Sequence, residues 1–128
     1  RVILPSKFRD PLSRGAIISK GDGCLFIYTL SEFEEVANEI REKSKASPQV
    51  REAARSFFAG ASDVTPDKQG RLNLPNPLRN YAKLKKEVTL LGVYSRIEIW
   101  DKEKWKSYNS DENISADEIA ENMTMLGI

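Results

Sequence analysis

A short motif with an arginine at each end, here called the arginine phrase, occurs twice in this sequence. Residues 1–9 read RVILPSKFR, and residues 71–79 read RLNLPNPLR. The matching positions are Arg1 with Arg71, Leu4 with Leu74, Pro5 with Pro75 and Arg9 with Arg79. A chain of 128 residues is long enough for one ordinary domain or for two intertwined half-domains. The repeat therefore predicts two similar units within one small protein.

Each copy of the phrase continues into a similar series of segments. The apolar segments are 17–18 and 25–28 in the first copy, and 88–91 and 97–100 in the second. We expect a strand carrying the arginine, a turn or short helix after the proline, and then two strands joined by a glycine-containing loop. Apolar and charged residues alternate in RIEIW at 96–100, which predicts that Ile97 and Ile99 face the interior. Arg96 and Glu98 are then expected to face water.

Helix signals lie between the two copies. Ser31 with Glu34 has the spacing of a capping box, in which both side chains bind free backbone N–H groups at the start of a helix. Further along, Ser47 is followed by Pro48, an N-cap residue with proline in the first helical position, and Gly60 is a suitable end for that helix. These patterns predict two helices between the copies.

A third helix is expected at the end of the chain. Ser115 with Glu118 repeats the spacing of a capping box, and Ile114 with Ile119 is placed to close over it as a hydrophobic staple.

The composition excludes several kinds of site. The chain has no histidine and one cysteine, Cys24, so it lacks the usual zinc ligand sets and cannot form an intramolecular disulfide. The missing histidine also removes the commonest general base near neutral pH. The longest apolar stretches, such as CLFIYTL at 24–30, fall short of the ~20 residues that a membrane-spanning helix needs. We therefore expect no catalysis, no metal or cofactor, no small-molecule substrate and no membrane partner.

A formal net charge of +1 conceals strongly segregated charge. Residues 1–20 contain five basic residues and one acidic residue, and residues 67–86 contain six and one. The rest of the chain is acidic, mainly in the segments 32–39 and 111–121. Such a distribution suits a basic surface that meets phosphate while acidic helices lie elsewhere. Ordinary solvated charge is the alternative, although it requires no segregation.

The second copy opens with a turn signature, TPDKQGRLNLP at 65–75. Asp67 is suited to bind the backbone two residues further on, and Gly70 is suited to a positive φ. Strand alternation after the turn places Arg71 and Asn73 on one face, with leucines on the other. Two side chains rich in hydrogen-bond donors are therefore expected to face outward.

The D-x-x-G-R turn, followed by an apolar strand, a proline and a second basic residue, resembles the signature of the MraZ family of bacterial transcriptional repressors. The tandem copy and the segment IEIWD before a tryptophan, at 97–105, are also similar to that family. The resemblance implies an α+β fold of two tandem AbrB/MraZ-type swapped-hairpin β-barrel modules, in a pseudo-two-fold arrangement and each followed by helices. The expected parts are a first module with its helix but without its upstream strand at 1–46, a linking helix at 47–60, a second module at 61–110 and a C-terminal helix at 111–128.

The resemblance also implies roles for particular residues. Arg1 and Arg71 would enter the major groove of DNA, where a guanidinium can bind both O6 and N7 of guanine. Phosphate contacts would come from further basic residues of the two phrases. The expected DNA-binding set is Arg1, Arg71, Asn73, Lys7, Arg9 and Arg79, with Asp67 and Gly70 as turn-forming residues.

At the level of the whole protein, the resemblance implies binding to short direct repeats in double-stranded DNA, upstream of the division and cell-wall gene cluster. Repression of that promoter by ring-shaped homo-oligomers would follow. The expected location is the cytoplasm, in association with the nucleoid.

Other interpretations remain open for the same residues. Arg71 is alternatively a surface arginine paired with Asp67, and Lys83, Lys85 and Lys86 read as a solvated edge that blocks unwanted strand pairing. The main alternative function is a non-catalytic ring scaffold whose basic edge binds an acidic protein partner, and a carboxylate-dependent hydrolase is a distant third. Steep dependence of binding on salt and on base sequence would favour DNA.

Overall fold

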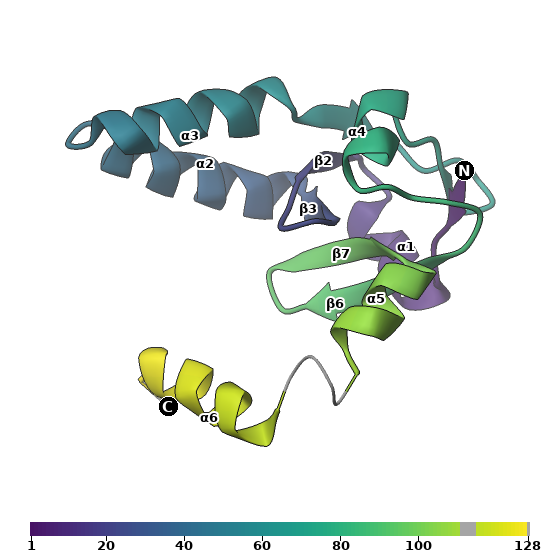
Figure 1. The fold of residues 1–128 in the computed structure, drawn as a ribbon. Helices are drawn as coiled ribbons and strands as arrows, with labels where there is room; N and C mark the ends of the chain where they lie inside the picture. The colour runs from purple at the N-terminus through teal and green to yellow at the C-terminus, as the bar shows by residue number, and fades with distance from the viewer. Residues whose placement is uncertain (111–114, 128) are drawn as a thin grey trace.

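The computed structural model of the chain describes residues 1–110 and 115–127. Its fold is mixed α+β with antiparallel sheets, as the sequence predicts (Figure 1). The elements in chain order are β1 Val2–Ile3, α1 Ser6–Leu12, β2 Ala16–Lys20, β3 Leu25–Thr29, α2 Leu30–Ser44, α3 Pro48–Ala59, β4 Ser62–Val64, β5 Arg71–Leu72, α4 Asn76–Tyr81, β6 Val88–Val93, β7 Arg96–Asp101, α5 Lys102–Tyr108 and α6 Ala116–Met125.

One antiparallel sheet joins the two copies, with the strand order β4-β2-β3-β7-β6. The hairpin β2–β3 belongs to the first copy and the hairpin β6–β7 to the second, as their apolar segments predict. The two hairpins meet through β3 and β7, where Leu25 lies opposite Ile99 and Ile27 opposite Ile97. The chain therefore contains two similar units that share a sheet.

The two arginine phrases also meet, in a small separate sheet made of β1 and β5. These strands are antiparallel, with Val2 opposite Leu72 and Ile3 opposite Arg71. The pairing continues beyond the strands, because the Leu4 backbone N–H donates to the Gly70 carbonyl at 2.8 Å. Segments far apart in the sequence thus lie side by side.

Apolar side chains from both copies fill a single core. Leu4 and Leu72, from the two phrases, are completely buried, as are Ile18 and Leu25 of the first hairpin and Ile99 of the second. Burying a side chain of this size stabilises a fold by roughly 1.5–3 kcal/mol. Removing any one of them from the core would therefore weaken the contact between the copies.

The alternation in β7 is confirmed for its isoleucines and wrong in part for its charged residues. Ile97 and Ile99 are buried, but the side chains of Arg96 and Glu98 are also largely covered, at 30% and 12% exposed. Their side chains form an ion pair at 2.9 Å, and the Arg96 guanidinium lies 4.1 Å from the ring centre of Phe26. Aromatic side chains on this face of the sheet therefore cover charges that alternation assigns to water.

The start of α2 corrects the predicted capping box. Thr29, not Ser31, is the N-cap: its hydroxyl oxygen accepts from the Glu32 backbone N–H at 3.1 Å and donates to the Glu32 carboxylate at 3.0 Å. The helix starts two residues early because β3 runs directly into it without a loop, so the last strand residue acts as the cap. Glu34 is left exposed.

The other predicted helix starts are confirmed. The Ser47 hydroxyl accepts from the Val50 backbone N–H at 3.3 Å, with Pro48 in the first turn of α3, and Gly60 follows its last residue. The Ser115 hydroxyl accepts from the Glu118 backbone N–H at 3.1 Å at the start of α6. The staple partner Ile114 lies outside the described residues.

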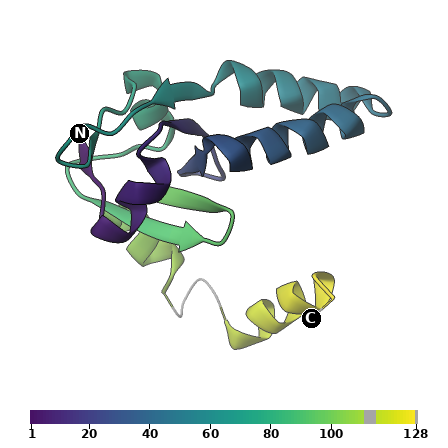
Figure 2. The same cartoon turned by 180° about the vertical axis from the view of Figure 1, so that it is seen from behind.

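The molecule has two ends of different character. The pair of helices α2 and α3, here called the helical hairpin, extends beyond the sheet to one side, and the N-terminus with β1 lies at the opposite end (Figures 1 and 2). The short helix α6 lies apart from the sheet in both views. The paired arginine phrases therefore occupy the end that faces away from the helical hairpin.

Candidate nucleic-acid interface

The pairing of β1 with β5 brings the two leading arginines together. Because Val2 lies opposite Leu72 in this antiparallel pair, the register places Arg1 opposite Asn73. Arg71 lies two residues before Asn73 on the same strand segment. Arg1, Asp67, Arg71 and Asn73 all line one hollow of about 110 Å³. Four of the residues that the sequence marks as site residues are thus neighbours.

Asp67 organises the turn that leads into β5. Its Oδ1 atom accepts from the backbone N–H groups of Gln69 and Arg71, both at 2.9 Å, as the turn signature predicts. The Gly70 N–H donates to the Asp67 carbonyl at 2.9 Å, and Gly70 has a φ of +77°. The conformation of Gly70 is one that residues with a Cβ rarely adopt.

The Arg71 guanidinium is oriented by its own turn. Its Nε donates to Asp67 Oδ2 at 2.7 Å, and one terminal nitrogen donates to the Gln69 side-chain oxygen at 3.3 Å. The backbone N–H of Arg71 and this ion pair together hold the pKa of Asp67 below its usual value. The ion pair is the one that the alternative interpretation of Arg71 expects, yet the Arg71 side chain remains 39% exposed. A guanidinium in this state is both fixed in direction and accessible.

Arg9 lies against the turn of the other copy. Its Nε donates to the Leu4 carbonyl at 2.9 Å, and a Cβ built on Gly70 would lie 2.8 Å from Arg9 Cδ. Arg9 also lines a hollow of about 330 Å³ together with Asp67 and Lys68. The second arginine of the first phrase therefore belongs to the same surface as the turn of the second phrase.

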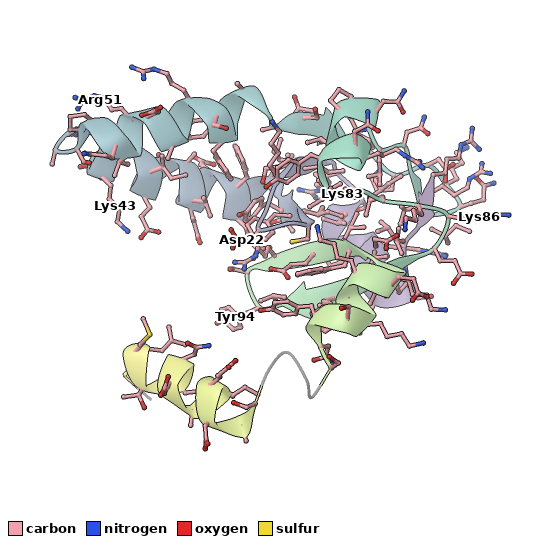
Figure 3. The ribbon with its side chains drawn as sticks, in the orientation of Figure 1. Asp22, Lys43, Arg51, Lys83, Lys86 and Tyr94 are labelled. Carbon is pink, nitrogen blue, oxygen red and sulfur yellow. The ribbon has the colours of Figure 1, made fainter. Side chains whose placement is uncertain are left out.

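Arg79, the counterpart of Arg9, lies close to Arg1. Both line a hollow of about 240 Å³, which Lys85 and Lys86 also line. Figure 3 shows Lys86 pointing outward at the end of the molecule opposite the helical hairpin. The lysine-rich pattern is typical of a solvated edge, and only the high positive charge of residues 67–86 indicates that these lysines belong to the site.

Lys7 lies elsewhere on the surface. Its Nζ is 5.1 Å from the ring centre of Phe8, and it lines a different hollow together with Tyr94 and Arg96. Lys7 does not line the two hollows of about 240 and 110 Å³ described above for Arg1. These hollows link Arg1, Arg71, Asn73, Arg79 and Arg9 through shared lining residues, whereas Lys7 lines another one.

Residues 1–110 and 115–127 contain no group of three or more acidic or cysteine side chains placed to hold a metal ion. None of their helices is long and apolar enough to cross a membrane.

Comparison with known proteins identifies close relatives. A family model described as "MraZ protein, putative antitoxin-like" matches residues 57–126, more than half of the chain. A protein of Acetivibrio thermocellus named transcriptional regulator MraZ is 51% identical, with 100% of this chain and 90% of the relative covered. Proteins of the same name from Finegoldia magna and Micrococcus luteus are 46% and 41% identical, with at least 96% of this chain and 87% of each relative covered.

Proposed function

Because this chain belongs to the MraZ family, we propose that it is a sequence-specific DNA-binding regulator of transcription. The pairing of β1 with β5 is the observation that carries the proposal, since it places the arginine phrases of both copies on one surface. Relatives with 41–51% identity bear the name of a transcriptional regulator. A basic surface with few acidic residues is what the DNA backbone requires of its partner.

In this proposal the leading arginines read base edges. Arg71 is held in direction by Asp67 and Gln69 while remaining accessible, and a fixed guanidinium suits bidentate binding to guanine O6 and N7. Arg1 takes the corresponding role in the first copy, and Asn73 donates or accepts beside it. The two copies then present similar contacts to similar half-sites.

The remaining basic residues hold phosphates and set the register on the duplex. Arg79, Lys85 and Lys86 line one hollow with Arg1, and Arg9 lies against the turn of the second copy. Lys7 contacts phosphate only if the duplex also reaches the hollow that Lys7 lines with Tyr94 and Arg96.

The finer description of the fold belongs to this proposal. We infer that the copies are AbrB-like swapped-hairpin modules at 1–46 and 61–110, linked by 47–60 and followed by 111–128. Two pairings support the exchange of strands between modules: β1 lies against β5, and β4, which precedes the second turn, lies against β2 of the first copy.

The regulatory role is proposed as repression of the division and cell-wall gene cluster in the cytoplasm, at the nucleoid. Direct repeats in the promoter would be bound by a ring-shaped homo-oligomer. One chain with few base contacts binds weakly, whereas linked modules on successive repeats gain avidity of about 10²-fold or more.

Fluorescence anisotropy on labelled duplexes selected from random DNA, at two salt concentrations, tests the proposal. We expect enrichment of a short, tandemly repeated motif. Arg71→Ala should weaken binding by about 1–3 kcal/mol per module and relax the preference at one position, while Lys86→Ala should weaken all sequences alike.

Lys106→Ala is the control, because it removes an exposed lysine from α5. An unchanged sequence preference in Arg71→Ala would overturn the assignment of base reading to this residue. Binding that ignores base sequence in the wild-type protein would instead favour the scaffold with an acidic protein partner.

A further inference from the structure

The helical hairpin has an apolar seam that the rest of the described chain leaves incompletely covered. Neither α2 nor α3 contains a buried residue, although the helices pack on each other. At the end of the hairpin next to the sheet, the rings of Phe33 and Phe57 stack on each other, and both pack edge-on against Tyr28 of β3. Farther out, the half-buried side chains of Ile40 and Val50 have no third layer over them. Amphipathic helices of this length normally bury one face against a further element.

The helix α6 likewise has an apolar side that no described residue covers. Every residue from Ser115 to Gly127 is exposed, and Ile119, Met123 and Leu126 lie on one side of the helix. A helix of 10 residues is too short to be stable by itself in water. Its apolar side therefore needs a surface to pack against.

The tip of the helical hairpin and α6 carry opposite net charges. Residues 41–55, here called the hairpin tip, contain five basic and two acidic residues, a balance of +3. The helix α6 contains three acidic residues and no basic one, a balance of −3. Lys43 and Lys45 are already paired with glutamates of α2, whereas the three tip arginines form no ion pair within the described residues. These arginines are Arg41, Arg51 and Arg55.

We propose that α6 of one copy packs on the hairpin tip of a neighbouring copy, with Met123 and Ile119 against the apolar seam and Glu118, at the edge of that apolar side, beside the tip arginines. This inference rests on the proposed function because it assumes the homo-oligomer proposed there. It adds which two surfaces form the contact between neighbouring copies. A contact between two different surfaces is head-to-tail, and its repetition closes a ring when the rotation allows. Figure 3 shows Arg51 at the end of the molecule opposite Lys86, so the contact leaves the arginine surface free.

The first test compares two adjacent substitutions in the 128-residue chain by light scattering after gel filtration. Met123→Glu places a charge on the apolar side of α6 and should reduce the mass to that of one chain, 14.5 kDa. Thr124→Glu adds the same charge about 100° around the helix and should leave the mass of the oligomer unchanged. An unchanged mass in Met123→Glu, or a wild-type protein that is monomeric, would overturn the proposal.

The second test identifies which chain supplies each surface. The double variant Arg51→Glu with Arg55→Glu should also be monomeric, because its hairpin tip repels α6. Mixed with Met123→Glu, it should form dimers of one chain of each kind, since one intact tip and one intact α6 remain. Absence of a mixed dimer would overturn the proposal in favour of docking within one chain or of hairpin on hairpin.

Failure of this inference is distinguishable from failure of DNA binding. A duplex with one repeat should bind Met123→Glu as well as wild type, while a duplex with tandem repeats should lose roughly 10²-fold in affinity with the avidity. Loss of oligomer with loss of single-repeat binding would contradict the assignment of separate surfaces.

Discussion

Asp67 binds Arg71 at two points: its Oδ1 atom accepts from the Arg71 backbone N–H at 2.9 Å, and its Oδ2 atom accepts from the Arg71 Nε at 2.7 Å. The same carboxylate therefore shapes the turn and directs the guanidinium. Charge-assisted bonds of this kind are about twice as strong as neutral ones. The position of a surface arginine is thus determined by a neighbour four residues before it.

Asp67→Asn separates orientation from charge. The amide oxygen keeps an acceptor for the backbone, but the ion pair with Arg71 is lost, and one negative charge leaves the basic surface. We expect tighter binding to DNA of any sequence and a smaller ratio between operator and random duplex. Anisotropy titrations on both duplexes measure this ratio, with Asp63→Asn, which removes an exposed carboxylate from β4, as the control. A ratio equal to that of wild type would show that Asp67 does not orient the base-reading group.

Stability should depend on acid through the same carboxylate. The folded-state pKa of Asp67 is lowered, first by the Arg71 backbone N–H, so its contribution is present above the unfolded-state pKa and is lost as pH falls through the folded-state pKa. The difference in unfolding free energy between wild type and Asp67→Asn should therefore have its largest value at neutral pH. It should shrink below pH 3.8, the ordinary value for an aspartate. Urea unfolding of both proteins from pH 7 to pH 3 measures it, and a difference that stays constant would contradict the ionised interaction.

Gly70→Ala should destabilise the fold strongly, although the substitution adds only one methyl group. The residue has a φ of +77°, and an added Cβ would meet the Arg9 side chain. Strain of this kind costs about 1–3 kcal/mol, before the contact with Arg9 is counted. Gly127→Ala is a matched control, because Gly127 has a φ of +79° with no described atom within 4 Å of its added Cβ.

Thermal unfolding of the two glycine variants, and of Gly70→Ala combined with Arg9→Ala, divides the cost. The double variant should recover the part that comes from the clash. If Gly70→Ala is no less stable than Gly127→Ala, the turn is not constrained as described.

Cys24 should be unreactive in the folded protein. Cys24 is 1% exposed, and burial, followed by the nearby Glu98 carboxylate, raises the pKa of its thiol to about 12. Since the thiolate is the reactive form, very little is present at pH 8. A chromogenic disulfide reagent should react at the rate of unfolding, and immediately in guanidinium chloride. Fast reaction of the folded protein would show that the loop before β3 opens independently.

Some of the site could be predicted from sequence because it depends on near neighbours. The turn of Asp67 and Gly70, the outward position of Arg71 and the two strand hairpins follow from spacings of two to four residues. Thr29 replaced Ser31 as the helix cap because β3 leads into α2 without a break, which local spacing does not reveal.

The sequence by itself determined that there are two copies of one pattern, with an arginine at the start of each and basic residues around it. Only the tertiary structure decided that β1 pairs with β5, that Arg79, Lys85 and Lys86 line one hollow with Arg1, and that Lys7 lines a different one. The physical reason is the range of the interactions involved. Turns, caps and alternation depend on residues a few positions apart. Strand pairing and core packing join segments as far apart in the sequence as the two copies are, and no local periodicity encodes which of these segments pair.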